Sequence, residues 1–201
     1  MAVKWKTKFD NLPAMTETVE SINKKSVKVG ALKNGGKLAW LAGVHEYGAT
    51  IKAKRAKLLT VPIHPDSVGK KAREIPDLFL FTAKSGEKFL AKGDGDNLIF
   101  YYWLTPSVTI PERSFLRAGH DANVKRIIEQ TERALGQVVA GKMSVDDMYK
   151  LYGQQMATAI KTYMRDLSNP PNSDATVLAK GSSNPLVDTG NLVESIDFKI
   201  D

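Results

Sequence analysis

The chain of 201 residues contains no cysteine and only three histidines. Without cysteine it can form no disulfide, no thiolate zinc site and no cysteine nucleophile. The histidines lie far apart in the sequence, which argues against a histidine metal site. No apolar run reaches the about 20 residues that a membrane span needs, and the lysine-rich start lacks the apolar segment of a signal peptide. We therefore expect a soluble chain with no cofactor, no metal ion and no membrane segment.

Positive charge, in contrast, is present in excess and is unevenly placed. The net charge is +7, and residues 1–60 hold 12 Lys and Arg against 4 Asp and Glu, whereas residues 61–201 hold 17 against 18. Such a skew is typical of binding to nucleic acid, of an acidic protein partner or of a solvated surface. Because no nucleic-acid motif accompanies the lysines, the sequence favours the last two.

The stretch Val44–Ile63, VHEYGATIKAKRAKLLTVPI, is interpreted as the centre around which the rest of the chain packs. Helical spacing up to Tyr47 is followed by Gly48, which predicts a helix that ends in a left-handed residue. A polar segment then predicts an exposed basic loop, and residues 58–63 predict a strand. The basic residues of the loop are candidate partner-interface residues: Lys52, Lys54, Arg55 and Lys57.

The remaining patterns predict an α+β fold, with a mixed or antiparallel sheet packed on helices, in one domain over residues 1–201. Alternating apolar residues predict strands at residues 3–9, 26–32 and 196–200. Apolar residues at three- to four-residue spacing predict a helix over residues 12–22.

Three later segments subdivide this domain. Residues 66–107 predict a β-meander excursion whose aromatic strand offers Tyr101 and Trp103 as further interface candidates. Residues 113–165 predict an antiparallel helical pair with a link of two to three residues. Residues 168–201 predict a long irregular loop and a closing strand. In the first helix of the pair, one apolar stripe contains Val124, Ile127, Ile128, Leu135, Val138 and Val139.

Several motifs that suggest chemistry are incomplete. Gly36 and Lys37 evoke a phosphate-binding loop, but Leu38 stands where that loop needs a hydroxyl. His45 and Glu46 begin a zinc-protease motif whose second histidine is replaced by Ala49. The turn at residues 93–96 lacks the bidentate glutamate of a calcium loop. Ser114 has no base nearby in the sequence that would activate it as a nucleophile.

The segment Leu186–Gly190, LVDTG, matches the Asp-Thr-Gly loop of aspartic peptidases. Half of such a peptidase needs several strands after this loop, and only 11 residues follow Gly190. The competing interpretation is a turn in which Asp188 caps a short helix over residues 192–195.

Three segments taken together resemble the tail-completion or neck proteins that join head and tail in tailed bacteriophages. These segments are VHEYGATIKAKRAKLLTVPI, IPERSFLR and NPPNSDATVLAKGSSNPLVDTGNLVESI, in this order over most of the chain. The family pattern has a His-Glu-Tyr/Phe-Gly turn, an Ile-Pro-x-Arg-x-Phe-Leu segment and a closing Leu-(Val/Ile)-Asp-Thr-Gly segment. Residues at its motif positions are Gly48, Pro111, Arg113, Phe115, Asp188, Thr189 and Gly190.

The resemblance implies a structural virion protein without catalysis. It implies a hexameric or dodecameric ring at the neck, assembled in the bacterial cytoplasm, that contacts a head-completion or connector protein and a tail terminator or tail tube protein. Genome DNA would pass through the lumen without sequence-specific binding. The motif residues would fix loop shapes rather than bind a ligand.

Three other functions stay open at this point. A tail terminator that caps the tail tube is also a small α+β ring protein. A DNA-binding module would use the N-terminal lysines, and its affinity would fall steeply with salt. Half of an aspartic peptidase would depend on Asp188.

Overall fold

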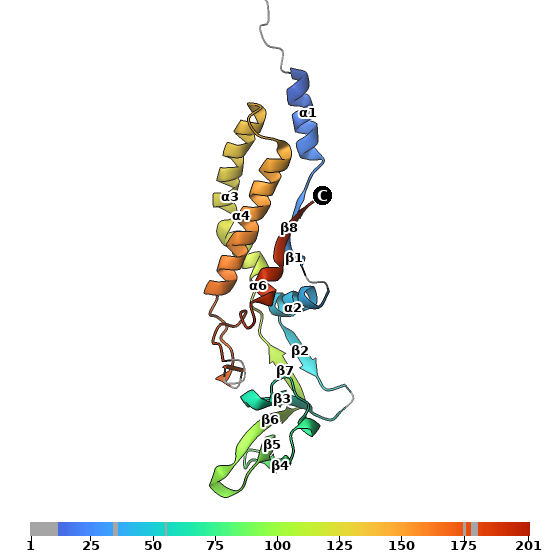
Figure 1. Ribbon diagram of the computed structural model, residues 1–201, viewed down its shortest axis with the longest axis vertical. Helices are drawn as coiled ribbons and strands as arrows, with labels where there is room; N and C mark the ends of the chain where they lie inside the picture. Colours follow the sequence, from blue (N-terminus) through green and yellow to red (C-terminus); the bar gives the residue numbers. More distant parts are fainter. Residues whose placement is uncertain (1–11, 34–35, 55, 175, 178–180) are drawn as a thin grey trace, which may run out of the picture.

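The computed structural model describes residues 12–33, 36–54, 56–174, 176–177 and 181–201. The molecule is elongated, with the helices at one end and a four-stranded sheet at the other (Figure 1). The helices are α1 (Leu12–Asn23), α2 (Gly36–Tyr47), α3 (Leu116–Val139), α4 (Val145–Asp166) and α6 (Asn191–Ser195). The strands are β1 (Val27–Ala31), β2 (Ala49–Lys52), β3 (Leu59–Pro62), β4 (Phe79–Thr82), β5 (Lys88–Lys92), β6 (Ile99–Thr105), β7 (Ser107–Ile110) and β8 (Ile196–Ile200).

All strand pairs in the described residues are antiparallel, and they form separate sheets rather than one. β1 pairs with β8 beside the helices, β2 pairs with β7 in the middle of the molecule, and the third sheet has the order β3-β6-β5-β4. We call this third sheet, residues 59–105, the sheet arm. The α+β class, the helical pair and the meander are therefore confirmed.

The stretch Val44–Ile63, which the sequence predicts as the centre of the fold, instead connects the helices to the sheet arm. α2 does end at Tyr47, and Gly48 has φ of +68°, as predicted. The predicted basic loop is wrong at its start, because Ala49–Lys52 is strand β2 and pairs with β7. This strand has only four residues, and its last residue, Lys52, begins the basic run from which the loop was predicted. The strand predicted over residues 58–63 is β3, which makes the sheet arm begin before residue 66.

The main core lies around α4 and not around that stretch. Residues from α3, α4, α6 and β8 form one cluster of buried side chains, among them Phe115, Ile127, Met156, Met164 and Ile196. Each of these five side chains is at most 1% exposed. Burying a side chain of this size stabilises the folded state by about 1.5–3 kcal/mol.

The helical pair is closed by local signals that the sequence shows plainly. Ser144 caps α4, because its Oγ accepts a hydrogen bond from the backbone N–H of Asp147 at 3.0 Å. Gly141 follows the end of α3 with φ of +69°, and Lys142 N–H donates to the carbonyl of Gln137 at 2.8 Å. The link spans residues 140–144, which is longer than predicted.

The apolar stripe predicted along α3 is only partly buried. Ile127 and Val138 lie in the core, but Ile128, Leu135 and Val139 are 46%, 38% and 49% exposed. The stripe is wider than the surface that α4 and α1 cover. None of the described helices is both long enough and apolar enough to span a membrane.

Some predictions lie outside the described residues. They are the strand over residues 3–9 and the interface candidate Arg55. The closing strand is confirmed as β8, and the short helix before it is α6.

A glycine in the middle of α4 allows the last strand to pack closely, which gives a first prediction. A Cβ added at Gly153 would lie 2.3 Å from Cδ2 and 2.5 Å from Cγ of Phe198 in β8. We expect Gly153→Ala to lower the free energy of unfolding by about 1–3 kcal/mol, measured by urea denaturation, because the phenyl ring must move. The control is Gly136→Ala in α3, where a Cβ meets no atom within 4 Å. It should raise the stability by about 0.5–1 kcal/mol, and equal effects would contradict the prediction.

Candidate functional site at the junction of three motif segments

The three segments that carry the family resemblance meet between α2, the start of α3 and the loop before α6. The first contact is made by Glu46, the last acidic residue of α2, which is 2% exposed. Its carboxylate accepts hydrogen bonds from the backbone N–H groups of Phe115 and Leu116, each at 2.8 Å, and of Arg117 at 3.1 Å. The N-terminus of a helix leaves such N–H groups without partners inside the helix. Glu46 therefore caps α3 from another helix.

Side chains complete the shell around this carboxylate. Ser114 Oγ donates to Oε1 at 2.8 Å, and Arg117 Nε donates to the same oxygen at 2.9 Å. Arg117 Nη2 also donates to the backbone carbonyl of Glu46 at 2.9 Å and to Glu112 Oε1 at 2.7 Å. Burial raises the pKa of Glu46, but the hydrogen bonds from Leu116, Arg117 and Ser114 outweigh it and hold the pKa below its usual value.

Ser114 contacts the carboxylate of Glu46, a residue that lies far from it in the sequence. A carboxylate with a lowered pKa and several donors is a weak base, so the contact does not activate the hydroxyl for attack. Its effect is to order the start of α3.

Gly48 allows the two backbones to approach each other at the same place. A Cβ added there would lie 2.9 Å from the backbone nitrogen of Glu112 and 3.0 Å from the carbonyl oxygen of Ile110. Arg113 N–H donates to the carbonyl of His45 at 2.7 Å just beside this approach. The glycine of the first motif is thus required by contact with the second motif as well as by its positive φ.

Arg113 joins the second segment to the third. It is 6% exposed, and its Nε donates to the carbonyl of Pro170 at 2.8 Å while Nη2 donates to the carbonyl of Pro171 at 2.9 Å. A longer contact of 3.4 Å joins Nη2 to Oδ1 of Asn172. Burial lowers the pKa of Arg113, although a guanidinium keeps its charge at neutral pH. Arg113 therefore holds the start of the long C-terminal loop.

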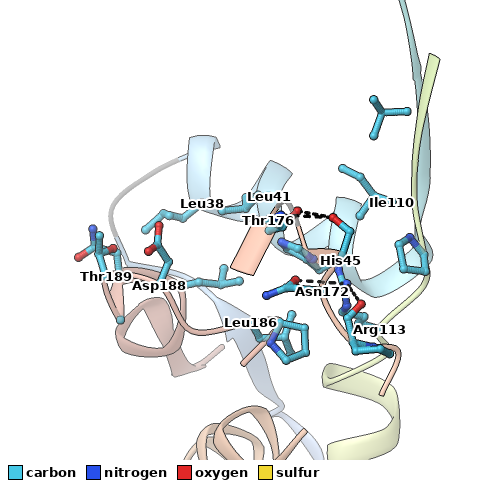
Figure 2. Close-up of a pocket in the computed structure, with 18 of the residues that line it drawn as sticks. Leu38, Leu41, His45, Ile110, Arg113, Asn172, Thr176, Leu186, Asp188 and Thr189 are labelled. Atoms are coloured by element: carbon cyan, nitrogen blue, oxygen red, sulfur yellow. Dashed lines mark hydrogen bonds between the residues drawn. The ribbon is translucent and has the colours of Figure 1, made fainter. Parts of the chain in front are cut away.

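A pocket of about 810 Å³ lies where the three segments meet (Figure 2). Its wall includes Leu38 and Leu41 of α2, Ile110 and Arg113, and it continues to Asp188. Asp188 and Thr189 are exposed at this wall, whereas Leu186 is buried. Gly190, with φ of +82°, is the residue before α6, and no side chain among the described residues caps that helix. The prediction that Asp188 caps the short helix is therefore wrong.

The predicted interface residues are not part of this junction. Lys52, Lys54 and Lys57 are exposed between the two ends of the molecule. Tyr101 and Trp103 are half-buried in the sheet arm, where Tyr101 stacks on His64 with 4.6 Å between ring centroids and Trp103 lies opposite Val61 and Phe89. Both aromatic residues are partly occupied by contacts within the chain.

Comparisons of the chain with protein-family models, with curated proteins and with solved structures found no match. The resemblance to neck proteins therefore depends on the motif residues alone. The motifs point to Gly48, Arg113 and Phe115 in the sequence but give Glu46 no role. The available signal was the one acidic residue of α2, at the end of a mostly apolar helix.

Proposed function

We propose that this chain is a structural virion protein that forms a ring at the head-to-tail interface of a tailed bacteriophage and joins the DNA-filled head to the tail. The observation that carries the proposal is the meeting of the three motif segments at one junction. Glu46 and Gly48 of the first hold the second, and Arg113 of the second holds the third. The motif residues are far apart in the sequence but contact one another in space. Such contacts fix the fold, which is the role that the family resemblance implies for these residues.

The shape of the molecule also supports a role in contacts with neighbours. The sheet arm extends away from the helices (Figure 1) and carries exposed apolar side chains, including Phe79, Leu80 and Ile99. The basic residues Lys52, Lys54 and Lys57 are exposed between the arm and the helices. An extended protein with such surfaces suits repeated contacts with copies of itself, with the connector side and with the tail side.

The test is electron microscopy of particles produced when the gene is deleted from the phage or prophage that encodes it. We expect DNA-filled heads beside separate, finished tails, because head and tail assemble without the joining ring. Tails of abnormal length would instead identify a tail terminator. Normal infectious particles would contradict both functions.

Complementation in the deletion strain supplies the control. The wild-type gene should restore joined particles, and Gly136→Ala should restore them equally, because a Cβ added at Gly136 meets no atom within 4 Å. A triple charge reversal, Lys52→Glu, Lys54→Glu and Lys57→Glu, should restore fewer joined particles while the purified variant stays folded. Full restoration would show that these lysines are only a solvated surface.

A further inference from the structure

The exposed face of α2 has the composition of a binding surface. Trp40 is 65% exposed and Tyr47 is 68% exposed, and both positions lie on one side of the helix. The guanidinium of Arg117 lies 4.7 Å from the ring centroid of Tyr47 and holds that ring in place. Trp, Tyr and Arg are the residues that most often dominate the binding energy of protein interfaces.

Gly43 lies between these two aromatic residues on the same side of the helix. A Cβ added at Gly43 would meet no atom within 4 Å, so nothing inside the chain requires a glycine there. Glycine inside a helix is unfavourable relative to alanine. Because Gly43 has no side chain, a partner can approach the helix backbone closely between Trp40 and Tyr47. We call Trp40, Gly43 and Tyr47 the α2 face.

The charge beside the α2 face is positive. Lys37 is exposed one turn before Trp40, whereas Lys33, just ahead of the helix, is paired with Asp197 at 3.0 Å. The only acidic residue of α2 is Glu46, which is buried and fully engaged at the start of α3. The α2 face therefore selects a partner that combines apolar side chains with negative charge.

The free end of the sheet arm has that combination. Phe79, Leu80 and Ile99 are 42%, 58% and 48% exposed. Asp77 is paired with Lys92 at 3.3 Å, whereas the exposed Asp94 and Asp96 lie in the turn that leads from β5 to β6. In the described part of the chain β4 is also an edge strand, because β5 is its single neighbour in the sheet. We call these residues the arm tip.

We propose that the arm tip of one copy of this chain docks on the α2 face of the next copy. Within one chain the arm tip points away from α2, so the contact has to be made between two copies (Figure 1). The two surfaces differ, and each copy carries both. Such a head-to-tail contact leaves one surface free at each end until the chain of copies closes, which it does as a ring when the rotation between neighbours permits. This inference rests on the proposed ring and names the surfaces that build it.

The remaining exposed apolar side chains of the described residues fit this contact less well. They are Met15 and Val19 on α1, then Ile128, Leu135 and Val139 on α3, and the single side chains Leu32, Ile51 and Val68. On α1, Glu20 is paired with Lys24, which leaves Glu17, whereas α3 carries charges of both signs at Glu129 and Arg133. The arm tip, with Asp94 and Asp96, has the larger excess of negative charge and is therefore the better complement of the α2 face.

The experiment measures self-association by sedimentation velocity over a concentration series of the full chain. The α2-face variant is Trp40→Ala with Gly43→Gln, and the arm-tip variant is Leu80→Gln with Ile99→Thr. Each should weaken self-association at least about thirtyfold, while its thermal unfolding midpoint stays close to that of the wild type. The control is Val139→Gln, which changes an equally exposed apolar residue on α3 and should associate like the wild type.

Mixing the two variants provides the decisive result. One variant keeps only the arm tip and the other keeps only the α2 face, so an equal mixture should form one-to-one dimers and nothing larger. A mixture that stays monomeric, or an arm-tip variant that associates like the wild type, would overturn the proposal. A wild-type chain that stays monomeric at every concentration would overturn it as well.

A charge exchange tests the complementarity directly. Lys37→Glu should weaken association, and Asp94→Lys with Asp96→Lys should restore it in the Lys37→Glu chain. If the interface fails these tests while gene deletion still separates heads from tails, the ring uses another surface and the proposed function stands. If deletion leaves infectious particles while the dimers form, the interface stands and the proposed function does not.

Discussion

Replacing Glu46 by alanine is expected to lower the free energy of unfolding by about 3–5 kcal/mol, measured by urea denaturation. The substitution removes the acceptor for three backbone N–H groups at the start of α3 and for the Ser114 hydroxyl. These donors lie beside Phe115, which is fully buried, so water cannot replace the carboxylate without opening the core. Glu46→Gln keeps the size and one acceptor oxygen and should cost less, about 2 kcal/mol.

The matched control is Glu129→Ala, which removes an exposed glutamate from the middle of α3. Its effect should stay within about 0.5 kcal/mol. If Glu46→Ala were as mild as this control, the capping contacts would contribute little, and the junction would be held by apolar packing alone.

The pH dependence of the same residue follows from the direction of its pKa shift. The pKa of Glu46 in the folded state lies below its ordinary value of 4.5. A carboxylate of this kind stabilises the folded state fully above the unfolded pKa, and the contribution is lost as pH falls through the folded pKa. The stability difference between the wild type and Glu46→Gln should therefore be constant near neutral pH and should shrink at acidic pH.

Acidic conditions also weaken other contacts, which is why the comparison with Glu46→Gln is needed. Lys199 and Lys28 lower the pKa of Asp201 to about 2. The two chains share this contribution, so it cancels in their difference. A difference that grows as pH falls would mean that the buried carboxylate destabilises the junction.

Local signals in the sequence were enough to place most elements of the fold. Gly48, Ser144 and Gly141 mark helix ends by conformations that depend on one residue and its neighbours. Apolar alternation likewise found β8, because one side of that strand packs on α4 and the other does not. Features that depend on contacts within a few residues are therefore readable without a structure.

Features that depend on distant contacts were missed or misplaced. β2 is predicted as part of a loop because the basic run of residues 52–57 begins within it, whereas its strand geometry comes from pairing with β7. Glu46 had no assigned role because its partners are the N–H groups of α3, which lie far along the chain. Helical spacing predicts one apolar stripe along α3, but it does not show how much of that stripe the neighbouring helices cover. Part of the stripe is therefore exposed.

The junction is only partly predictable from the sequence, because its contacts also join distant residues. Motif positions drew attention to Arg113, but its partners are backbone carbonyls of a loop rich in Pro, Asn and Ser. Backbone carbonyls carry no sequence signal of their own. A buried arginine held by neutral acceptors therefore has no visible partner in the sequence.

Arg113→Met is expected to lower the free energy of unfolding by about 2–4 kcal/mol. The two carbonyls that it binds belong to consecutive prolines, and neither proline has an N–H with which the loop could form its own turn. Methionine fills much of the volume but donates no hydrogen bond, so the carbonyls of Pro170 and Pro171 lose their donor. Limited proteolysis should then cut within residues 168–185 faster than in the wild type.

Two further variants separate charge from geometry at this position. Arg113→Lys keeps the positive charge, but one ammonium group cannot reproduce the fork that reaches both carbonyls, so it should recover less than half of the loss. Arg133→Met removes an exposed arginine from α3 and should change stability by less than about 0.5 kcal/mol. Full recovery by lysine would show that charge alone holds the loop. Equal loss in the two methionine variants would mean that the third motif segment stays in place without Arg113.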